Sequence, residues 1–495
     1  MKKRLKILVS GIFLLLLTVS YGQGWQVSPG TNIIVETGTT LYLDAGGSVV
    51  LEDDLSSSPS LLEKGTVTFN GGGDLKVQQY LERGEWHIVS SPVNNEVIEA
   101  YLDMYLYSYD ETTDAFTNLY QPLTVPLNVG EGYHVWSVSS SPDYVMLNGT
   151  SNKSDVNCTL TVTDATNHSG WNLLGNPFPC AIDWNGNADW NLNNVGPTVY
   201  LFDAGGTGNY ATWNYSSGTG TNGKTDGLIA ATQGFWVRTS DTIGNQPSYS
   251  LTIPASQRVA SASTEFYKGN GIEYNLLRIN VQGEKYADEC IIAFNSDATD
   301  GFDNKFDAYK LFTETPSPKI YTETANVKTA VNFMNSPENH KTVPVAFSPG
   351  TDGIFIMSIS GIESFPNDLP VYLEDKKDNM FMDLRENSVY TFSGTITDDN
   401  NRFVIHFANP LGIDNPANIS QMNSIHIYGQ KNSIIVNIPF RFDGTIEVYN
   451  LLGKKVSEKD AYKGKNNLIV SDANGYYIVK VIGKEGIKTQ KVYLR

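Results

Sequence analysis

Short apolar runs of strand length, each closed by turn-forming residues, are the feature that most constrains how this chain can fold. Runs rich in Val, Ile, Tyr, Phe and Thr alternate with clusters of Gly, Asn, Asp, Ser and Pro. Almost no segment has the spacing of three and four that marks an amphipathic helix. The pattern predicts an all-β protein of tandem β-sandwich domains, since short strands bury their apolar faces by packing sheet on sheet. With 495 residues, several domains are expected.

Residues 1–23 have the character of a signal peptide. Four basic residues precede the apolar run LVSGIFLLLLTV, and small residues then offer a cleavage point before Gln23 or Gly24. The run is too short for a membrane anchor, and no later stretch is apolar enough to span a bilayer. We therefore expect an exported chain with no transmembrane segment in its mature form.

Residues 24–74 form a short strand-rich N-terminal region. Its strands recur at roughly eight-residue spacing, with glycine or acidic turns between them. This spacing predicts either the start of a β-solenoid or a set of strands that caps the next domain. A solenoid needs about three stacked units, so the region is too short to stand alone.

A degenerate repeat spans residues 75–255, with copies at about 75–155 and 156–255. The run EWHIVSSPVNN (85–95) aligns with GWNLLGNPFPC (170–180), LYSYDE (106–111) with VYLFDA (199–204), and GEGYHVWS (130–137) with TQGFWVRT (232–239). In each copy a Trp begins a strand and a Pro ends it. Because each copy has few strands, we expect the two to face one another in a single β-sandwich with a shared core.

Three further segments complete the predicted organisation. Residues 262–409 contain seven strand-like runs, which suffice for a second β-sandwich. Residues 410–423 are rich in Pro and Asn, a composition typical of a linker. Residues 424–495 predict a C-terminal immunoglobulin-like sandwich near the lower practical limit of core size.

Charge separates the C-terminal unit from the rest of the chain. Residues 424–495 contain 12 Lys or Arg and 6 Asp or Glu, whereas residues 24–423 hold 19 basic and 47 acidic residues, a net charge of −28. Such an acidic body repels phosphate backbones, so nucleic acid is not an expected partner. The charge favours solubility outside the cell and the binding of divalent cations.

Four motifs in the C-terminal unit carry a family resemblance. They are IEVYNLLGKKV (446–456), a Gly-Lys-Asn-Asn-Leu turn into a strand, NGYYIVKV (474–481) and KTQKVYLR (488–495). In this order they resemble the type A C-terminal sorting domain of type IX secretion cargo. The resemblance implies the type IX machinery as a partner and a secreted or outer-membrane-surface location, after which the tail is commonly cleaved. The positions that match the family pattern are Tyr449, Asn450, Gly453, Val456, Gly475, Tyr477, Val479, Lys491 and Val492.

The body also resembles a known group, through fewer residues. The run W-x-L-x-x-N-P-F (171–178), with Ile182, Asp183 and Trp184 after it, and DNKFDAYKL (303–311) resemble uncharacterised secreted β-sandwich modules that precede this sorting domain. Most of those relatives have no assigned activity, so the resemblance implies architecture and leaves the function open.

An acidic loop is the candidate metal site. Asp297, Asp300, Asp303 and Asp307 follow a predicted strand, with Asn295 and Asn304 nearby. Calcium prefers six to eight such oxygen ligands, although the spacing departs from that of an EF-hand. Calcium is therefore the one cofactor to consider. The alternative is an acidic turn whose side chains cap backbone amides.

Loop aromatics are the candidate ligand-binding residues. Trp184, Trp190, Tyr210 and Trp213 have no firm counterpart in the first repeat copy and lie among Asn and Gly. Flat aromatic faces beside amides and carboxylates are typical of sugar-binding β-sandwiches. The alternative is that these rings cover a sandwich edge.

No sequence motif for catalysis is present. Metalloprotease, nucleophile-elbow, phosphate-loop and Cys-x-x-Cys patterns are all missing from the sequence. The sequence leaves undecided whether Cys158 and Cys180 form a disulfide. We expect a secreted, non-enzymatic protein for adhesion or for binding an extracellular glycan or matrix protein. The alternative is a carbohydrate-active hydrolase, whose carboxylate pair needs no sequence motif.

Overall fold

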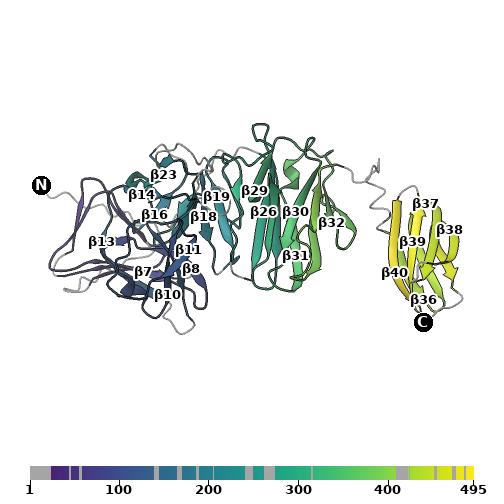
Figure 1. Cartoon of the computed structure of the whole chain (residues 1–495), viewed down its shortest axis with the longest axis horizontal. Helices are drawn as coiled ribbons and strands as arrows, with labels where there is room; N and C mark the ends of the chain where they lie inside the picture. The colour runs from purple at the N-terminus through teal and green to yellow at the C-terminus, as the bar shows by residue number, and fades with distance from the viewer. Residues whose placement is uncertain are drawn as a thin grey trace. The chain divides into compact units, whose positions relative to one another are not determined.

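The computed structural model confirms the all-β prediction (Figure 1). Besides strands it has three short 3-10 helices among the described residues: η1 (Ile98–Tyr101), η2 (Ala255–Gln257) and η3 (Ile362–Ser364). None of the described helices is long and apolar enough to cross a bilayer. The predicted signal peptide, and the predicted linker apart from Met422, lie outside the described residues. The structure describes residues 24–43, 46–54, 58, 60–138, 144–163, 170–185, 189–204, 206–239, 249–260, 274–313, 316–408, 422, 424–450, 454–470, 475–483 and 486–494.

Contacts divide the chain into two compact units. The first comprises residues 1–339, 344–365 and 387–403, and the second comprises 340–343, 366–386 and 404–495. The boundary predicted between residues 255 and 262 falls inside the first unit. The repeat and most of the segment 262–409 therefore belong to one compact body.

The N-terminal region is the start of a parallel β-solenoid. Strand β1 pairs with β4 and β4 with β7, β2 pairs with β5, and β3 pairs with β6, all in parallel. Two coils are thus stacked, and β7 begins a third before pairing antiparallel with β13 of the first repeat copy. The strands are β1 (Trp25–Val27), β2 (Asn32–Val35), β3 (Thr40–Leu43), β4 (Val49–Leu51), β5 (Ser60–Glu63), β6 (Thr66–Phe69), β7 (Leu75–Tyr80) and β13 (Tyr144–Ser151).

Each repeat copy contains one sheet, and the two sheets have the same strand order. In the first copy the order is β8-β12-β10-β11, and in the second it is β15-β22-β18-β19, followed by β20. The first set is β8 (Trp86–Ser90), β10 (Tyr105–Asp110), β11 (Ala115–Asn118) and β12 (Gly132–Trp136). The second is β15 (Trp171–Gly175), β18 (Thr198–Phe202), β19 (Tyr210–Asn214), β20 (Thr219–Gly220) and β22 (Gly234–Arg238).

Each copy also closes its own core, so the expectation of one shared core is wrong. Val89 and Val135 belong to the first core, whereas Phe235 and Val237 belong to a separate second core. The physical reason is that these sheets carry apolar residues on both faces, and a third, aromatic cluster lies between the copies. The opposing strands are β9 (Val93–Asn94), β14 (Val156–Leu160), β16 (Ala181–Asp183), β17 (Asn191–Asn193), β21 (Leu228–Ile229), β23 (Tyr249–Ile253) and β24 (Arg258–Val259).

The two copies contact one another through equivalent residues. Val89 forms a bridge with Gln233, and Leu174 forms one with Glu131. In the sequence alignment Val89 corresponds to Leu174, and Glu131 to Gln233. The two bridges are therefore the same contact with the copies exchanged, which describes a pseudo-twofold relation between them.

A third sheet completes the first unit. Within the first unit its strands have the order β30-β28-β29-β26-β25-β31-β34, with β27 paired to β29, and several of them lie side by side in Figure 1. The strands are β25 (Asn275–Gln282), β26 (Ala287–Phe294), β27 (Ala308–Tyr309), β28 (Lys319–Thr324), β29 (Val327–Met334), β30 (Thr342–Ser348), β31 (Gly353–Ser360) and β34 (Val389–Gly394).

The second unit includes the immunoglobulin-like C-terminal domain. Its sheet has the order β36-β37-β39-β40, and β38 pairs with β37. Alternate residues of β37 and β39, among them Ile446, Val448, Val479 and Val481, are fully buried in its core. The strands of the unit are β32 (Tyr372–Asp375), β33 (Met380–Asp383), β35 (Phe403–His406), β36 (His426–Gln430), β37 (Ser433–Asn450), β38 (Lys455–Ile469), β39 (Gly475–Gly483) and β40 (Gly486–Leu494).

Candidate functional site

The acidic loop is held by bonds within the protein. Asp307 is buried, and its carboxylate accepts hydrogen bonds from the backbone amides of Phe333 and Asp303, at 2.7 Å each. Asp303 in turn caps the amide of Lys305 at 3.0 Å. The carboxylate of Asp307 is thus engaged by two backbone donors, the arrangement of a capped acidic turn.

Calcium gains no support from this geometry. Nowhere in the described part of the chain do three or more His, Cys, Asp or Glu side chains form a metal-binding group. Asp297, Asp300, Asp303 and Asp307 all lie in that part; Asp303 and Asp307 contact one another, but the four do not form such a group. The alternative of an acidic turn accounts for the bonds that are seen.

The four predicted ligand-binding aromatics lie in the core instead of on loop surfaces. Trp184 and Trp190 are 1% and 7% exposed, and Tyr210 and Trp213, both on β19, are 9% exposed. The indole N–H groups of Trp184 and Trp190 donate to the carbonyls of Pro197 and Asp183 at 2.8 Å. The exposed stacking platform predicted for them is absent, because Trp184, Trp190 and Trp213 are buried in the second copy's core and Tyr210 is buried in the aromatic cluster between the copies.

A different set of aromatics reaches the surface, on the face of the first copy's sheet whose other part contacts Trp236 and Phe202 of the second copy. Cross-strand pairing places Trp136 opposite both Trp86 and Tyr105, and His134 opposite Tyr107. Trp86 stacks on His134 with ring centroids 4.5 Å apart, and its centroid is 5.3 Å from Trp136 and 5.8 Å from Tyr107. We call this set the aromatic surface; it comprises Trp86, Tyr105, Tyr107, Phe116, His134 and Trp136.

The aromatic surface is open to solvent and uncharged. Tyr105 and Phe116 are 51% and 45% exposed, and the other four members are half-buried. Burial, with a smaller contribution from His87, lowers the pKa of His134 to about 4. His134 is therefore a neutral aromatic ring at neutral pH. A flat, neutral set of π-faces offers stacking to a ligand ring.

The corresponding face of the second copy is covered. Trp171, which corresponds to Trp86, is 7% exposed and packs edge-on against Tyr200 and Tyr309. The guanidinium of Arg238 lies 3.9 Å above the ring of Tyr309. Because β27 carries Tyr309 onto this face, only the first copy displays its aromatics.

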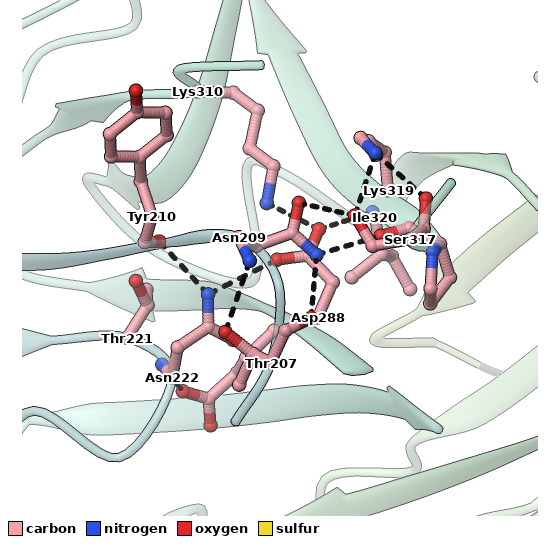
Figure 2. Close-up of polar contacts among 12 residues, drawn as sticks. Thr207, Asn209, Tyr210, Thr221, Asn222, Asp288, Lys310, Ser317, Lys319 and Ile320 are labelled. Atoms are coloured by element: carbon pink, nitrogen blue, oxygen red, sulfur yellow. Dashed lines mark hydrogen bonds and ion pairs between the residues drawn. The ribbon is translucent and has the colours of Figure 1, made fainter. Parts of the chain in front are cut away.

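A buried polar network joins the second copy to the third sheet (Figure 2). Asp288 and Lys310 form an ion pair with both side chains almost fully buried. The same carboxylate accepts bonds from the amide of Ile320 at 2.7 Å and the side chain of Asn222 at 3.2 Å. Asn209 extends the network by donating to the carbonyl of Ala287 at 2.8 Å. Because the ion pair at the centre of the network is buried from solvent, the network has a structural role: it holds the second copy and the third sheet together. We call it the joint.

Four carboxyl groups with a raised pKa are the candidates for the hydrolase alternative. Burial is the main cause of the shift in each, and it raises the pKa of Asp53 to about 6 and that of Asp307 to about 7. The pKa values of Asp183 and Glu289 are also raised. Each carboxylate accepts a backbone amide bond within the fold. These bonds account for all four as structural groups.

The three cysteines are free thiols. Cys180 and Cys290 are fully buried, and burial raises the pKa of the Cys180 thiol to about 12. The disulfide between Cys158 and Cys180, which the sequence left undecided, is therefore not formed in this structure. The buried thiols act as small apolar side chains.

The sorting-domain residues combine core and surface positions. Tyr477 is buried in the core, and Gly475 has a φ of 142° that favours glycine. The hydroxyl of Tyr449 donates to Glu447 at 2.6 Å, and the Asn450 side chain accepts the Lys454 amide at 3.0 Å. The ammonium of Lys491 lies 4.2 Å from the ring centroid of Tyr476. Gly453 lies outside the described residues.

Sequence reasoning missed the aromatic surface. Trp86 and Trp171 occupy equivalent repeat positions, and that equivalence favoured core packing for both. A usable signal was present in YLYSYD and HVW, where rings recur at every second position of a strand. The period shows that the rings share one face but does not show which face stays uncovered.

Comparison with known proteins gives two family matches. A family model described as "Domain of unknown function (DUF8693)" matches residues 9–407. A model described as "Secretion system C-terminal sorting domain" matches residues 429–495, which confirms the resemblance seen in the C-terminal motifs. No curated protein matches.

One solved structure that matches is described as "Biofilm associated protein - BSP domain". It is 10% identical, and the match covers 84% of this chain and 61% of that chain with a TM-score of 0.12. The chain thus spans about three fifths of that structure's length. At this TM-score the likeness carries no argument about fold or function.

Proposed function

Since the chain belongs to the DUF8693 family and ends in a secretion-system sorting domain, we propose that it binds an extracellular glycan as a non-enzymatic surface protein. The sorting domain marks the chain as secreted or attached to the outer-membrane surface and implies contact with the type IX machinery. What is proposed is the role of the body: adhesion, or the binding of a glycan or a matrix protein.

The observation that carries the proposal is the aromatic surface. Trp86, Tyr107 and Trp136 form a contiguous set of rings that are only half-buried, and Tyr105 extends it with half of its side chain exposed. Exposed large rings in a group are unusual on a soluble protein and mark binding sites. Pyranose rings present flat C–H faces, and such faces stack on aromatic rings.

The test is a glycan and matrix-protein binding screen with the exported chain. We expect glycan binding that weakens about tenfold in Trp86→Ala and in Tyr105→Ala, since the loss of one stacking ring costs about 1 to 1.5 kcal/mol. Tyr120→Ala is the matched control, because Tyr120 is 71% exposed but lies outside the aromatic surface. Thermal melting of each variant separates lost binding from lost folding.

Two outcomes would count against the proposal. One is the absence of binding to any glycan in the screen, and the other is glycan binding that Trp86→Ala and Tyr105→Ala leave unchanged. Binding to a matrix protein alone would favour adhesion without glycan recognition. The screen is run with and without calcium, and we expect the same binding in both, because two backbone amides already occupy the Asp307 carboxylate.

A further inference from the structure

The first coil of the solenoid leaves three strand edges open at once. In the described part of the chain, β1, β2 and β3 each pair on one side only, with β4, β5 and β6. An open strand edge presents backbone N–H and C=O groups that another strand can pair with. Three such edges around one coil form a surface that a single extended strand cannot fill.

The hydrogen bonds show which backbone groups face outward. The carbonyls of Thr31 and Val35 accept bonds from the β5 side, so the alternate residues Asn32 and Ile34 direct their backbone groups to the open edge. On β1 the Trp25 amide and the Val27 carbonyl bond toward β4, which leaves Gln26 facing outward.

The same reasoning applies to β3. The carbonyls of Thr39 and Leu43 accept amides of the second coil, so Thr40 and Tyr42 face the open edge. The side chain of Asn32 adds a separate observation. It is 7% exposed, yet its Oδ1 has no hydrogen-bond donor among the described residues. A buried amide oxygen without a donor favours a partner that supplies one.

The open edges lack the features that usually block edge pairing. Residues 24–43 contain one charged residue, Glu36, and no proline inside the three strands. Natural sheets protect open edges with charges, prolines or bulges. The body as a whole carries a net charge of −28, so two copies repel one another over most of their surface. The first coil is a weakly charged exception, with Glu36 as the one charged residue in 24–43, and two copies can approach there.

We propose that two copies of the mature chain pair through the open edges of β1, β2 and β3. Only another coil of this kind presents three matching edges in the same arrangement, and this favours a second copy as the partner. The opposite end of the solenoid is closed, because β7 continues into the sheet of the first repeat copy. Growth therefore stops at a dimer. The proposal rests on removal of residues 1–23 and is independent of glycan binding.

The test is sedimentation velocity of the exported chain over about 1 to 100 µM, a range in which weak interfaces dissociate. We expect a monomer–dimer equilibrium that shifts by about tenfold or more toward monomer in Gln26→Pro/Tyr42→Pro. Both side chains are exposed, and proline removes only amides that face the open edge. Gln26→Ala/Tyr42→Ala is the matched control, because it removes the side chains and keeps the amides.

Amide hydrogen exchange gives a second readout that needs no variant. Protection of Gln26, Ile34 and Tyr42 is expected to rise with concentration, whereas protection of Ile33 is expected to stay constant. A wild-type chain that begins near Gly24 and stays monomeric would overturn the proposal. So would a dimer that survives the proline pair. A monomer that retains residues 1–23 would identify that segment as the occupant of the edges, which also overturns it.

Discussion

At the scale of single residues, buried carboxylates make part of the stability depend on pH. Burial raises the pKa of Asp307 from 3.8 to about 7. The folded chain therefore binds this proton more tightly than the unfolded chain does. Its contribution to the free energy of unfolding is fully present below about pH 4 and is lost as the pH rises through 7.

Asp307→Asn removes this titration. We expect the free energy of unfolding of the wild-type chain to fall between pH 5 and pH 8 more steeply than that of the variant, because the variant has no carboxylate to ionise there. Denaturant unfolding at several pH values measures both slopes. Asp297→Asn is the control, since Asp297 is exposed in the same loop. Equal slopes in the wild type and Asp307→Asn would contradict this prediction.

At the scale of elements, two glycines allow strands of the two copies to approach one another closely where they cross. A Cβ at Gly132 on β12 would lie 2.3 Å from the carbonyl oxygen of Leu174 on β15. A Cβ at Gly234 on β22 would lie 2.5 Å from the Ile88 side chain on β8. These two glycines occupy the same repeat position, so the pseudo-twofold relation imposes the same restriction twice.

Gly132→Ala and Gly234→Ala are each expected to destabilise the first unit by about 2 kcal/mol or more, since a methyl group there forces packed backbone apart. Gly353→Ala is the matched control, because a Cβ at Gly353 on β31 would meet nothing within 4 Å. Denaturant midpoints give the comparison. Destabilisation by Gly353→Ala as large as that by the other two would show that the crossing is not the cause.

Much of the element-level organisation could be predicted from the sequence, and its assembly could not. Strand runs and the repeat are local patterns, and the sorting domain has its own motifs. The contact at Gly132 joins residues 42 positions apart in the sequence (174 − 132), and that at Gly234 joins residues 146 positions apart (234 − 88). Strand period carries no information on such distant contacts. The burial of Trp184 and Trp213, and the exposure of Trp86, also depend on which sheet faces remain covered.

At the scale of the whole molecule, a network around the Asp288–Lys310 ion pair joins the repeat to the third sheet. Both partners of the pair belong to the third sheet, and Asn222 and Asn209 reach the network from the second copy. The side chains of the pair are 0% and 3% exposed, and Asp288 also binds the amide of Ile320 and the side chain of Asn222. A buried pair adds little net stability, but removal of one partner leaves a charge without compensation. The joint therefore makes the first unit respond to unfolding as one body.

Lys310→Met is expected to destabilise the first unit by about 3 to 5 kcal/mol, because it leaves the Asp288 charge buried. Lys310→Met/Asp288→Asn is expected to cost less than the sum of the single changes, since the double variant buries no charge. Denaturant unfolding followed by two probes, in the repeat and in the third sheet, measures the cycle. Lys76→Met removes an exposed ion pair and is the control. Two results would contradict this prediction. One is a double variant whose loss of unfolding free energy equals the sum of the single losses, and the other is a wild-type chain in which the two probes report separate unfolding transitions.

The covered face of the second copy gives the repeat a division of labour. Trp86 and Trp171 occupy equivalent positions of the repeat, yet the first ring is partly exposed to solvent and the second packs against Tyr309 of the third sheet. With two copies in one chain, the first copy can serve the proposed recognition, and the second copy can support the third sheet. Under the proposed glycan binding, exchange of the first copy's rings is expected to change the ligand, while the buried rings of the second copy stay in place as packing residues.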